Sequence, residues 1–170
     1  MSKKTFVIAL ACAGICAASS MSIQAKESDE AQLAKSLSTA GVSLDQGLRS
    51  SVAQGKPISG RFEINSNGAQ LTVYLTQGGK FSEVILDRQS GFIKTARTIT
   101  DTGDLKAANA QSQAMKKAKV PLDKAVRDSV TANPGYLAAS VMPTLRANRP
   151  IAEIVLMNGT ETRKVFKPLD

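Results

Sequence analysis

The side chains that most enzymes use for catalysis are scarce in this sequence. Histidine is absent from its 170 residues, and both cysteines, Cys12 and Cys16, lie near the N-terminus. Ordinary zinc sites, Cys-His pairs and Ser-His-Asp triads therefore cannot be built from the rest of the chain. Carboxylate pairs remain possible, but Glu83 and Asp87 are better explained as a solvent-facing strand residue and a turn residue. We expect a protein that is not an enzyme and has no catalytic residue, metal site or cofactor.

These two carboxylates belong to residues 71–91, whose pattern predicts a β-hairpin followed by a second turn. Leu71, Val73 and Leu75 alternate with polar residues, which is the period of a strand with one buried face and one face in water. Val84 and Leu86 continue the buried set on the next strand. We expect these five residues to form a core beneath a helix.

Glycine, proline and aspartate mark the turns of the predicted sheets. A Gly-Gly pair supplies the positive φ angles of a tight hairpin, an Asp-x-x-x-Gly segment brackets the next turn, and a Pro-Gly pair separates a helix from a later strand. The predicted structural turn residues are Gly78, Gly79, Asp87, Gly91, Pro134 and Gly135.

Residues 1–25 have the layout of a secretory signal peptide, with two lysines, an apolar run and then small residues. The run is shorter than the roughly 20 residues that span a bilayer, so we expect cleavage, after Ala25 or nearer Ala18. Both cysteines are then lost, and the mature chain must be held together by packing alone. We expect residues 26–170 to be periplasmic or secreted, without stable membrane insertion.

The charge of the mature chain is moderately basic. Removing Lys3 and Lys4 lowers the formal net charge from +8 to +6. Such a surface attracts acidic proteins, anionic lipids or sugar polymers weakly. The chain has no Trp and few aromatic residues with which to stack bases, so we expect no nucleic-acid partner.

The chain also repeats part of its own sequence. VSLDQGLRSSV at 42–52 recurs as VPLDKAVRDSV at 120–130, an offset of 78 residues. LTVYL at 71–75 is matched by AEIVL at 152–156, an offset of 81, so three extra residues fall between the two matches. A helix and a hairpin match in the same order, and we therefore interpret the chain as two related units.

The predicted organisation is α+β, with tandem helix-plus-antiparallel-sheet units. After the signal peptide, residues 26–100 form the first unit and 101–170 the second, whose sheet should be one strand shorter. The expected helices cover 30–40, 42–52, 105–118 and 120–130, and the expected strands cover 57–65, 69–77, 80–88, 91–99, 136–146, 150–157 and 161–168.

The two repeated helices should carry equivalent apolar stripes. In the first, Ser43 and Gln46 form a capping-box pattern, and four residues share a face: Leu44, Leu48, Ser51 and Val52. The second helix has Pro121 at the position of Ser43. The acidic and basic pairs of these helices, four residues apart, predict surface ion pairs: Asp45 with Arg49, and Asp123 with Arg127.

With these elements in place, the first unit resembles the PepSY domain. The matching segments are VSLDQ at 42–46, GKPI at 55–58, LTVYL at 71–75 and EVILDRQSGFI at 83–93. The second unit is similar to a diverged copy: NPGYL at 133–137 fits the Pro-Gly start of the family's sheet, but the closing Asp-x-x-x-Gly is absent.

The resemblance implies an exported α+β module of the kind found in metallopeptidase propeptides and bacterial envelope proteins, where it is proposed to bind or restrain peptidases. The tandem layout is also similar to the β-lactamase-inhibitor protein, whose sheet supplies the contact surface. The family defines no binding residue that can be carried over, so the resemblance implies a class of role and no site.

Two hypotheses about function follow. The first is a binding module that inhibits or regulates a protein partner such as a peptidase, and the second is an envelope sensor or structural module that contacts anionic polymers. A Thr/Tyr-rich or apolar open sheet face favours the first. The second requires four basic residues to cluster on one sheet face: Lys80, Arg88, Lys94 and Arg97.

Overall fold

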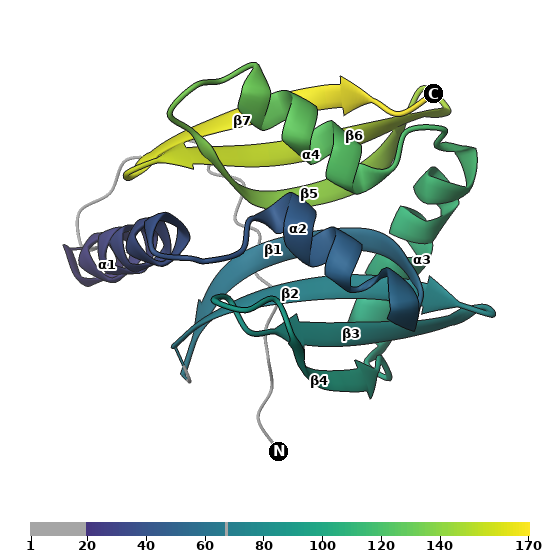
Figure 1. The fold of residues 1–170 in the computed structure, drawn as a ribbon, viewed down its shortest axis with the longest axis horizontal. Helices are drawn as coiled ribbons and strands as arrows, with labels where there is room; N and C mark the ends of the chain where they lie inside the picture. The colour runs from purple at the N-terminus through teal and green to yellow at the C-terminus, as the bar shows by residue number, and fades with distance from the viewer. Residues whose placement is uncertain (1–19, 67) are drawn as a thin grey trace.

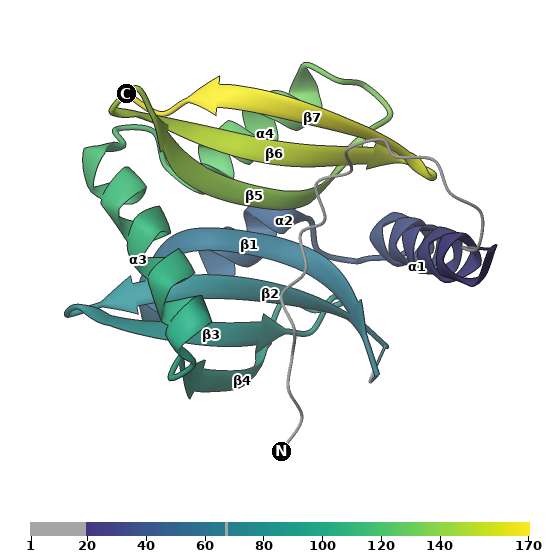
Figure 2. The same cartoon turned by 180° about the vertical axis from the view of Figure 1, so that it is seen from behind.

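The computed structural model describes the chain at residues 20–66 and 68–170, and shows an α+β fold built on one antiparallel sheet (Figures 1 and 2). The elements, in chain order, are α1 (Ser20–Ser38), α2 (Leu44–Ser50), the 3₁₀ turn η1 (Val52–Gln54), β1 (Lys56–Asn65), β2 (Gly68–Gln77), β3 (Lys80–Leu86), β4 (Ile93–Thr98), α3 (Thr102–Lys117), α4 (Leu122–Thr131), β5 (Leu137–Arg146), β6 (Arg149–Asn158) and β7 (Glu161–Pro168).

The sheet has the strand order β4-β3-β2-β1-β5-β6-β7. Each predicted strand is present with its ends shifted by no more than two residues, and β5–β7 have one strand fewer than β1–β4. The two groups of strands share one sheet because β1 pairs with β5. That junction is short and contains only Gly60 opposite Val141 and Arg61 opposite Ser140.

The strand register places one apolar and one largely polar row of residues across all seven strands. On the face toward α2 and α4 the row is, from β4 to β7, Ala96, Val84, Val73, Gly60, Val141, Ile154 and Val165. On the opposite face the adjacent row is Thr95, Ile85, Thr72, Arg61, Ser140, Val155 and Lys164.

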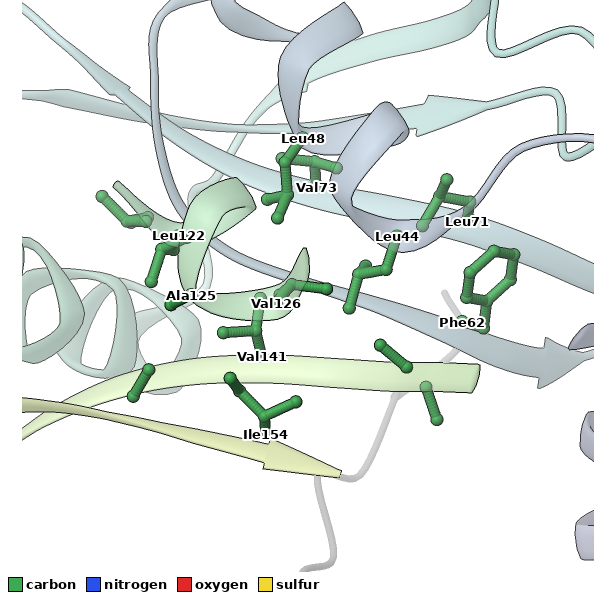
Figure 3. Close-up of a cluster of buried hydrophobic side chains, with 14 of the residues drawn as sticks. Leu44, Leu48, Phe62, Leu71, Val73, Leu122, Ala125, Val126, Val141 and Ile154 are labelled. Carbon is green, nitrogen blue, oxygen red and sulfur yellow. The ribbon is translucent and has the colours of Figure 1, made fainter. Parts of the chain in front are cut away.

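Helices α2 and α4 lie side by side on the apolar face and share one core with it (Figures 1 and 3). Leu44 and Leu48 of α2 and Val126 of α4 are buried against strand residues such as Val73 and Ile154. Burial of each such side chain contributes about 1.5–3 kcal/mol. The predicted strand core is confirmed, since its five members are almost fully buried: Leu71, Val73, Leu75, Val84 and Leu86.

Val52 was predicted to belong to this core, and that prediction is wrong. Helix α2 ends at Ser50 and the chain tightens into η1, so the helical stripe stops before Val52, which is 58% exposed. Ser51, which was predicted on the same face, is buried, and its hydroxyl donates to the Leu48 carbonyl at 2.8 Å.

The ion pairs predicted along α2 and α4 are present and are joined by a third. Arg49 lies 2.8 Å from Asp45, and Arg127 lies 3.8 Å from Asp123. Arg49 also lies 3.7 Å from Asp123, which links the two helices. At the start of α2 the Ser43 backbone N–H donates to the Gln46 side chain at 2.8 Å, as a capping box requires.

Helix α3 crosses the face of the sheet opposite α2 and α4 (Figure 2). Helix α1 lies beside the C-terminal end of β1. The prediction of α1 over 30–40 was too short, since the helix begins at Ser20. Residues 1–19, which hold most of the predicted signal peptide, lie outside the described residues. No helix in the described part of the chain is long and apolar enough to cross a membrane.

A one-residue bulge interrupts β1 at Ile58, and another interrupts β5 at Ala139. Beside the first bulge Leu75 lies opposite Pro57, and beside the second Leu156 lies opposite Ala138. The two bulges are therefore separated by the same number of residues as Leu75 and Leu156. Bulges increase local twist and re-aim the side chains that follow. Both bulges come directly before a serine of the polar face, Ser59 in β1 and Ser140 in β5.

Candidate binding surface

The face of the sheet opposite α2 and α4 carries the polar row from Thr95 to Lys164 and the residues beside it. We call it the open face, although α3 crosses part of it. Thr72 and Glu83 were expected to face water on this side, and that expectation is wrong, because they are 0% and 7% exposed. The Thr72 hydroxyl donates to Glu63 at 2.8 Å. The Gln70 amide donates to Glu63 at 2.7 Å and to the Thr72 hydroxyl at 3.1 Å. These bonds satisfy the polar groups that the sheet buries.

Positive and negative charges on the open face are paired with each other. Arg61 Nη2 lies 2.8 Å from Glu63 Oε2, and Arg97 Nε donates to Glu83 Oε2 at 2.6 Å. On the other half of the sheet, Lys164 lies 3.0 Å from Glu153. The open face therefore combines threonine, tyrosine and apolar side chains with locally neutralised charge, and lacks the strong field of an unpaired basic patch.

The four basic residues that would have marked a polymer-binding face do not form one cluster. Lys94 pairs with Asp87 at 2.7 Å, and Arg97 belongs to the pair with Glu83. Arg88 lies in the β3–β4 turn and donates to the Ser36 carbonyl and Thr39 hydroxyl of the α1 end. Lys80 begins β3 at the far end of the β2–β3 hairpin.

A cavity of about 150 Å³ lies where α3 crosses the open face. Its volume equals that of about five water molecules, or one side chain of a partner. Ser59 donates to Gln111 of α3 at 2.8 Å and anchors the helix over the sheet. The lining is Ser59, Gly60, Arg61, Tyr74, Ser140, Val141 and Met142 from the sheet, with Asp104, Ala107, Ala108 and Gln111 from α3.

Tyr74 forms one wall of this cavity. Arg61 donates to its hydroxyl at 3.0 Å and lies 5.6 Å from the ring centroid. Burial raises the pKa of Tyr74 to about 12, against the opposing effect of the Arg61 charge. A phenol with a raised pKa favours the folded state below its ordinary pKa near 10, and this contribution is lost as the pH rises from 10 toward 12.

We therefore expect Tyr74 to be almost entirely un-ionised in the folded protein at pH 10, measured by ultraviolet absorbance titration. The pKa of Tyr136, the second tyrosine, is also raised, by the hydrogen bond of its hydroxyl to Glu161. Tyr74→Phe should remove a transition near pH 12, and Tyr136→Phe should leave that transition in place. A transition of Tyr74 near pH 10 would mean that its hydroxyl is not buried as described.

The predicted turn residues all lie outside the open face. Gly78 and Gly79 connect β2 to β3 with φ angles of +57° and +79°, a conformation that glycine adopts without strain. Pro134 and Gly135 lie between α4 and β5, where the Asn133 carbonyl accepts from the Tyr136 N–H at 3.1 Å.

Asp87 and Gly91 form the β3–β4 turn, which holds the α1–α2 connection in place. The Asp87 carboxylate accepts from the backbone N–H groups of Gln89 and Ser90 at 3.0 and 2.8 Å. Its pair with Lys94 and these bonds hold the pKa of Asp87 below its ordinary value. The Arg88 carbonyl in turn accepts from the Val42 N–H at 3.1 Å, so the Asp-x-x-x-Gly segment has a packing role here.

Arg61, Glu63 and Ser140 were not singled out from the sequence. A signal existed for the first two, since they alternate with Gly60 and Phe62 and so share a face with Ser59. Their proximity to Ser140 could not be predicted, because it depends on β1 pairing with β5.

Within residues 29–66 and 68–170, no group of three side chains of the metal-binding types comes together. No family model, curated protein or solved structure matches this chain.

Proposed function

We propose that this chain is an exported, non-enzymatic binding protein of two PepSY-like units that acts on another protein in the periplasm. The class of partner that the resemblance implies is a peptidase, which the protein inhibits or regulates. The observation that carries the proposal is the open face, where threonine, tyrosine and apolar side chains surround charges that are already paired. Such a surface binds by shape and hydrogen bonding rather than by net charge.

Duplication of one unit is supported by the register of the sheet. The bulges at Ile58 and Ala139 are separated by the same offset as the matched strand sequences. Gly60 and Val141 correspond by that offset and pair with each other, as a two-fold relation between the halves would require. In the helices, Ser51 and Ser129 correspond and are both fully buried, with their hydroxyls donating to backbone carbonyls of the preceding turn.

The PepSY-like character of the first unit is supported by the roles of the matching segments. The segment at 42–46 begins α2, the segment at 55–58 leads into β1, and the closing Asp-x-x-x-Gly is the turn that supports the α1–α2 connection. Export is supported by the apolar N-terminal segment alone.

Edge strand β4 offers a second way to contact a partner. Residues 94–98 are all exposed, and strand addition to such an edge would extend the open face. Charged side chains at Lys94 and Arg97 protect this edge from unspecific pairing.

The test is capture of a partner by residues 26–170 from an envelope extract at physiological salt, followed by assay of the captured peptidase. Thr95 and Thr98 provide a matched pair of positions, since both are exposed on β4 but lie on opposite faces. Thr95→Arg places a bulky charge on the open face and should reduce capture at least about tenfold, a loss of about 1.4 kcal/mol in binding free energy.

Thr98→Arg adds the same charge on the other face and should leave capture unchanged. Equal loss in both variants would show that charge, not the open face, governs binding. Failure to capture any protein, or hydrolase activity of the purified chain, would contradict the proposal.

A further inference from the structure

A groove of about 560 Å³ lies at the end of the sheet where β1 begins, between η1 and the α3–α4 connection. Its volume is within the range of ligand-binding pockets. Val52 and Pro57 form one side, and Met115, Val120 and Pro121 form the other. Val52 does not join the core, and its exposed apolar side chain lines this groove.

The other half of the molecule fills the corresponding position. Lys56 pairs with Thr76 at the start of the β1–β2 ladder, and Leu137 pairs with Met157 at the start of the β5–β6 ladder. Met157 is buried, whereas Thr76 is half-buried. Tyr136, also buried, stands where the first half has Gly55. The groove therefore exists because small residues replace a tyrosine and a methionine.

Lysines surround this groove. Lys56 and Lys119 line it, and Lys116 lines an adjoining hollow that shares Lys56, Thr76 and Met115. Lys56 donates to the Met115 carbonyl at 3.1 Å, while the side-chain amines of Lys116 and Lys119 make no hydrogen bond or ion pair within the described part of the chain.

The acidic residues near these lysines are engaged by arginines. Asp170 pairs with Arg149 at 2.8 Å, and this hydrogen bond, together with the charge of Lys119, lowers the pKa of Asp170. Asp123 is the groove's only carboxylate among the described residues and lies 3.7 Å from Arg49 and 3.8 Å from Arg127. The positive charge of Lys116, in the last turn of α3, interacts favourably with the helix dipole. Lys56 and Lys119 lie outside the helix and have no such role. The groove is thus apolar along its length and positively charged at its rim, in contrast to the open face.

We propose that this groove binds a segment of the protein partner that carries acidic residues beside apolar ones. The inference rests on the proposed function and adds a second contact surface to it. Apolar side chains of the segment occupy the space between Val52 and Val120, and its carboxylates pair with Lys56 and Lys119. Two surfaces engaged together raise the overall affinity above that of either alone.

The experiment selects random phage-displayed peptides on residues 26–170 and measures the enriched peptides, made synthetically, by fluorescence polarisation. The selected peptides should be acidic and apolar. Thr76→Met, which introduces the residue found in the other half, should weaken their binding at least about tenfold, and Lys119→Glu should do the same. Melting temperatures should show that both variants are folded.

Two substitutions serve as controls outside the groove. Lys106→Glu changes the charge of an exposed lysine of α3 in the same way, and Thr98→Met adds the same side chain on β4, so both should bind the peptides normally. Enrichment of basic peptides, peptides indifferent to Thr76→Met, no enrichment, or binding only to anionic lipid vesicles would each overturn the inference. Capture of a protein partner sensitive to Thr95→Arg would then still support the proposed function.

Discussion

Val73→Asp should lower the free energy of unfolding by more than about 4 kcal/mol. Val73 is fully buried in the apolar row, between Gly60 and Val84 and beneath α2 (Figure 3). An aspartate there would be an unpaired buried charge, which places the loss above about 4 kcal/mol, a large part of the stability of an ordinary domain. The measurement is the free energy of unfolding from urea titration.

Ala96→Asp is the matched control for this substitution. Ala96 belongs to the same row, opposite Val84, but it lies on edge strand β4 and is exposed. Its carboxylate can remain in water, so we expect a change within about 0.5 kcal/mol. An unchanged urea midpoint in Val73→Asp would show that the wrong face of the sheet has been assigned to the core.

Gly47→Ala should destabilise the protein even though alanine is the better helix former. A methyl group at Gly47 would overlap Leu71 Cδ2, and both residues are buried. We expect a loss of about 1–3 kcal/mol from overpacking, larger than the gain of about 1 kcal/mol in helix propensity. Leu71→Ala alone should cost about 2–5 kcal/mol through the cavity that it leaves.

The double variant tests the correspondence of the two halves. In the second half, Ala125 is equivalent to Gly47 and Ala152 is equivalent to Leu71, and both alanines are buried. Gly47→Ala with Leu71→Ala should therefore be more stable than the sum of the single effects by about 1–2 kcal/mol. Additivity within about 0.5 kcal/mol would mean that the two side chains do not compete for the same space.

Strand positions and the core of the first half could be predicted from the sequence, because period-2 alternation reports directly which side chains face inward. Leu71, Val73 and Leu75 follow this rule without exception. The β2–β3 turn could also be predicted from the sequence, since Gly78 and Gly79 have a backbone conformation that few other residues adopt.

The end of α2 and the burial of the open face could not be predicted. Val52 continues a helical stripe in the sequence, but the helix stops two residues before it. Thr72 and Glu83 look solvent-facing in an isolated hairpin, yet side chains from other strands, Glu63 and Arg97, cover and pair with them. The groove depends on long-range placement of α3 against β1, which no local pattern encodes.

The central claim is that this chain recognises a protein through its open face rather than anionic polymers through its net charge. The most direct test is the affinity of the purified residues 26–170 for the captured partner and for an anionic polysaccharide as ionic strength rises from about 0.05 to about 0.5 M. We predict that the affinity for the partner changes only a few-fold over this range and falls at least about tenfold in Thr95→Arg. Binding to the polymer alone, falling steeply with salt and unaffected by Thr95→Arg, would contradict the account.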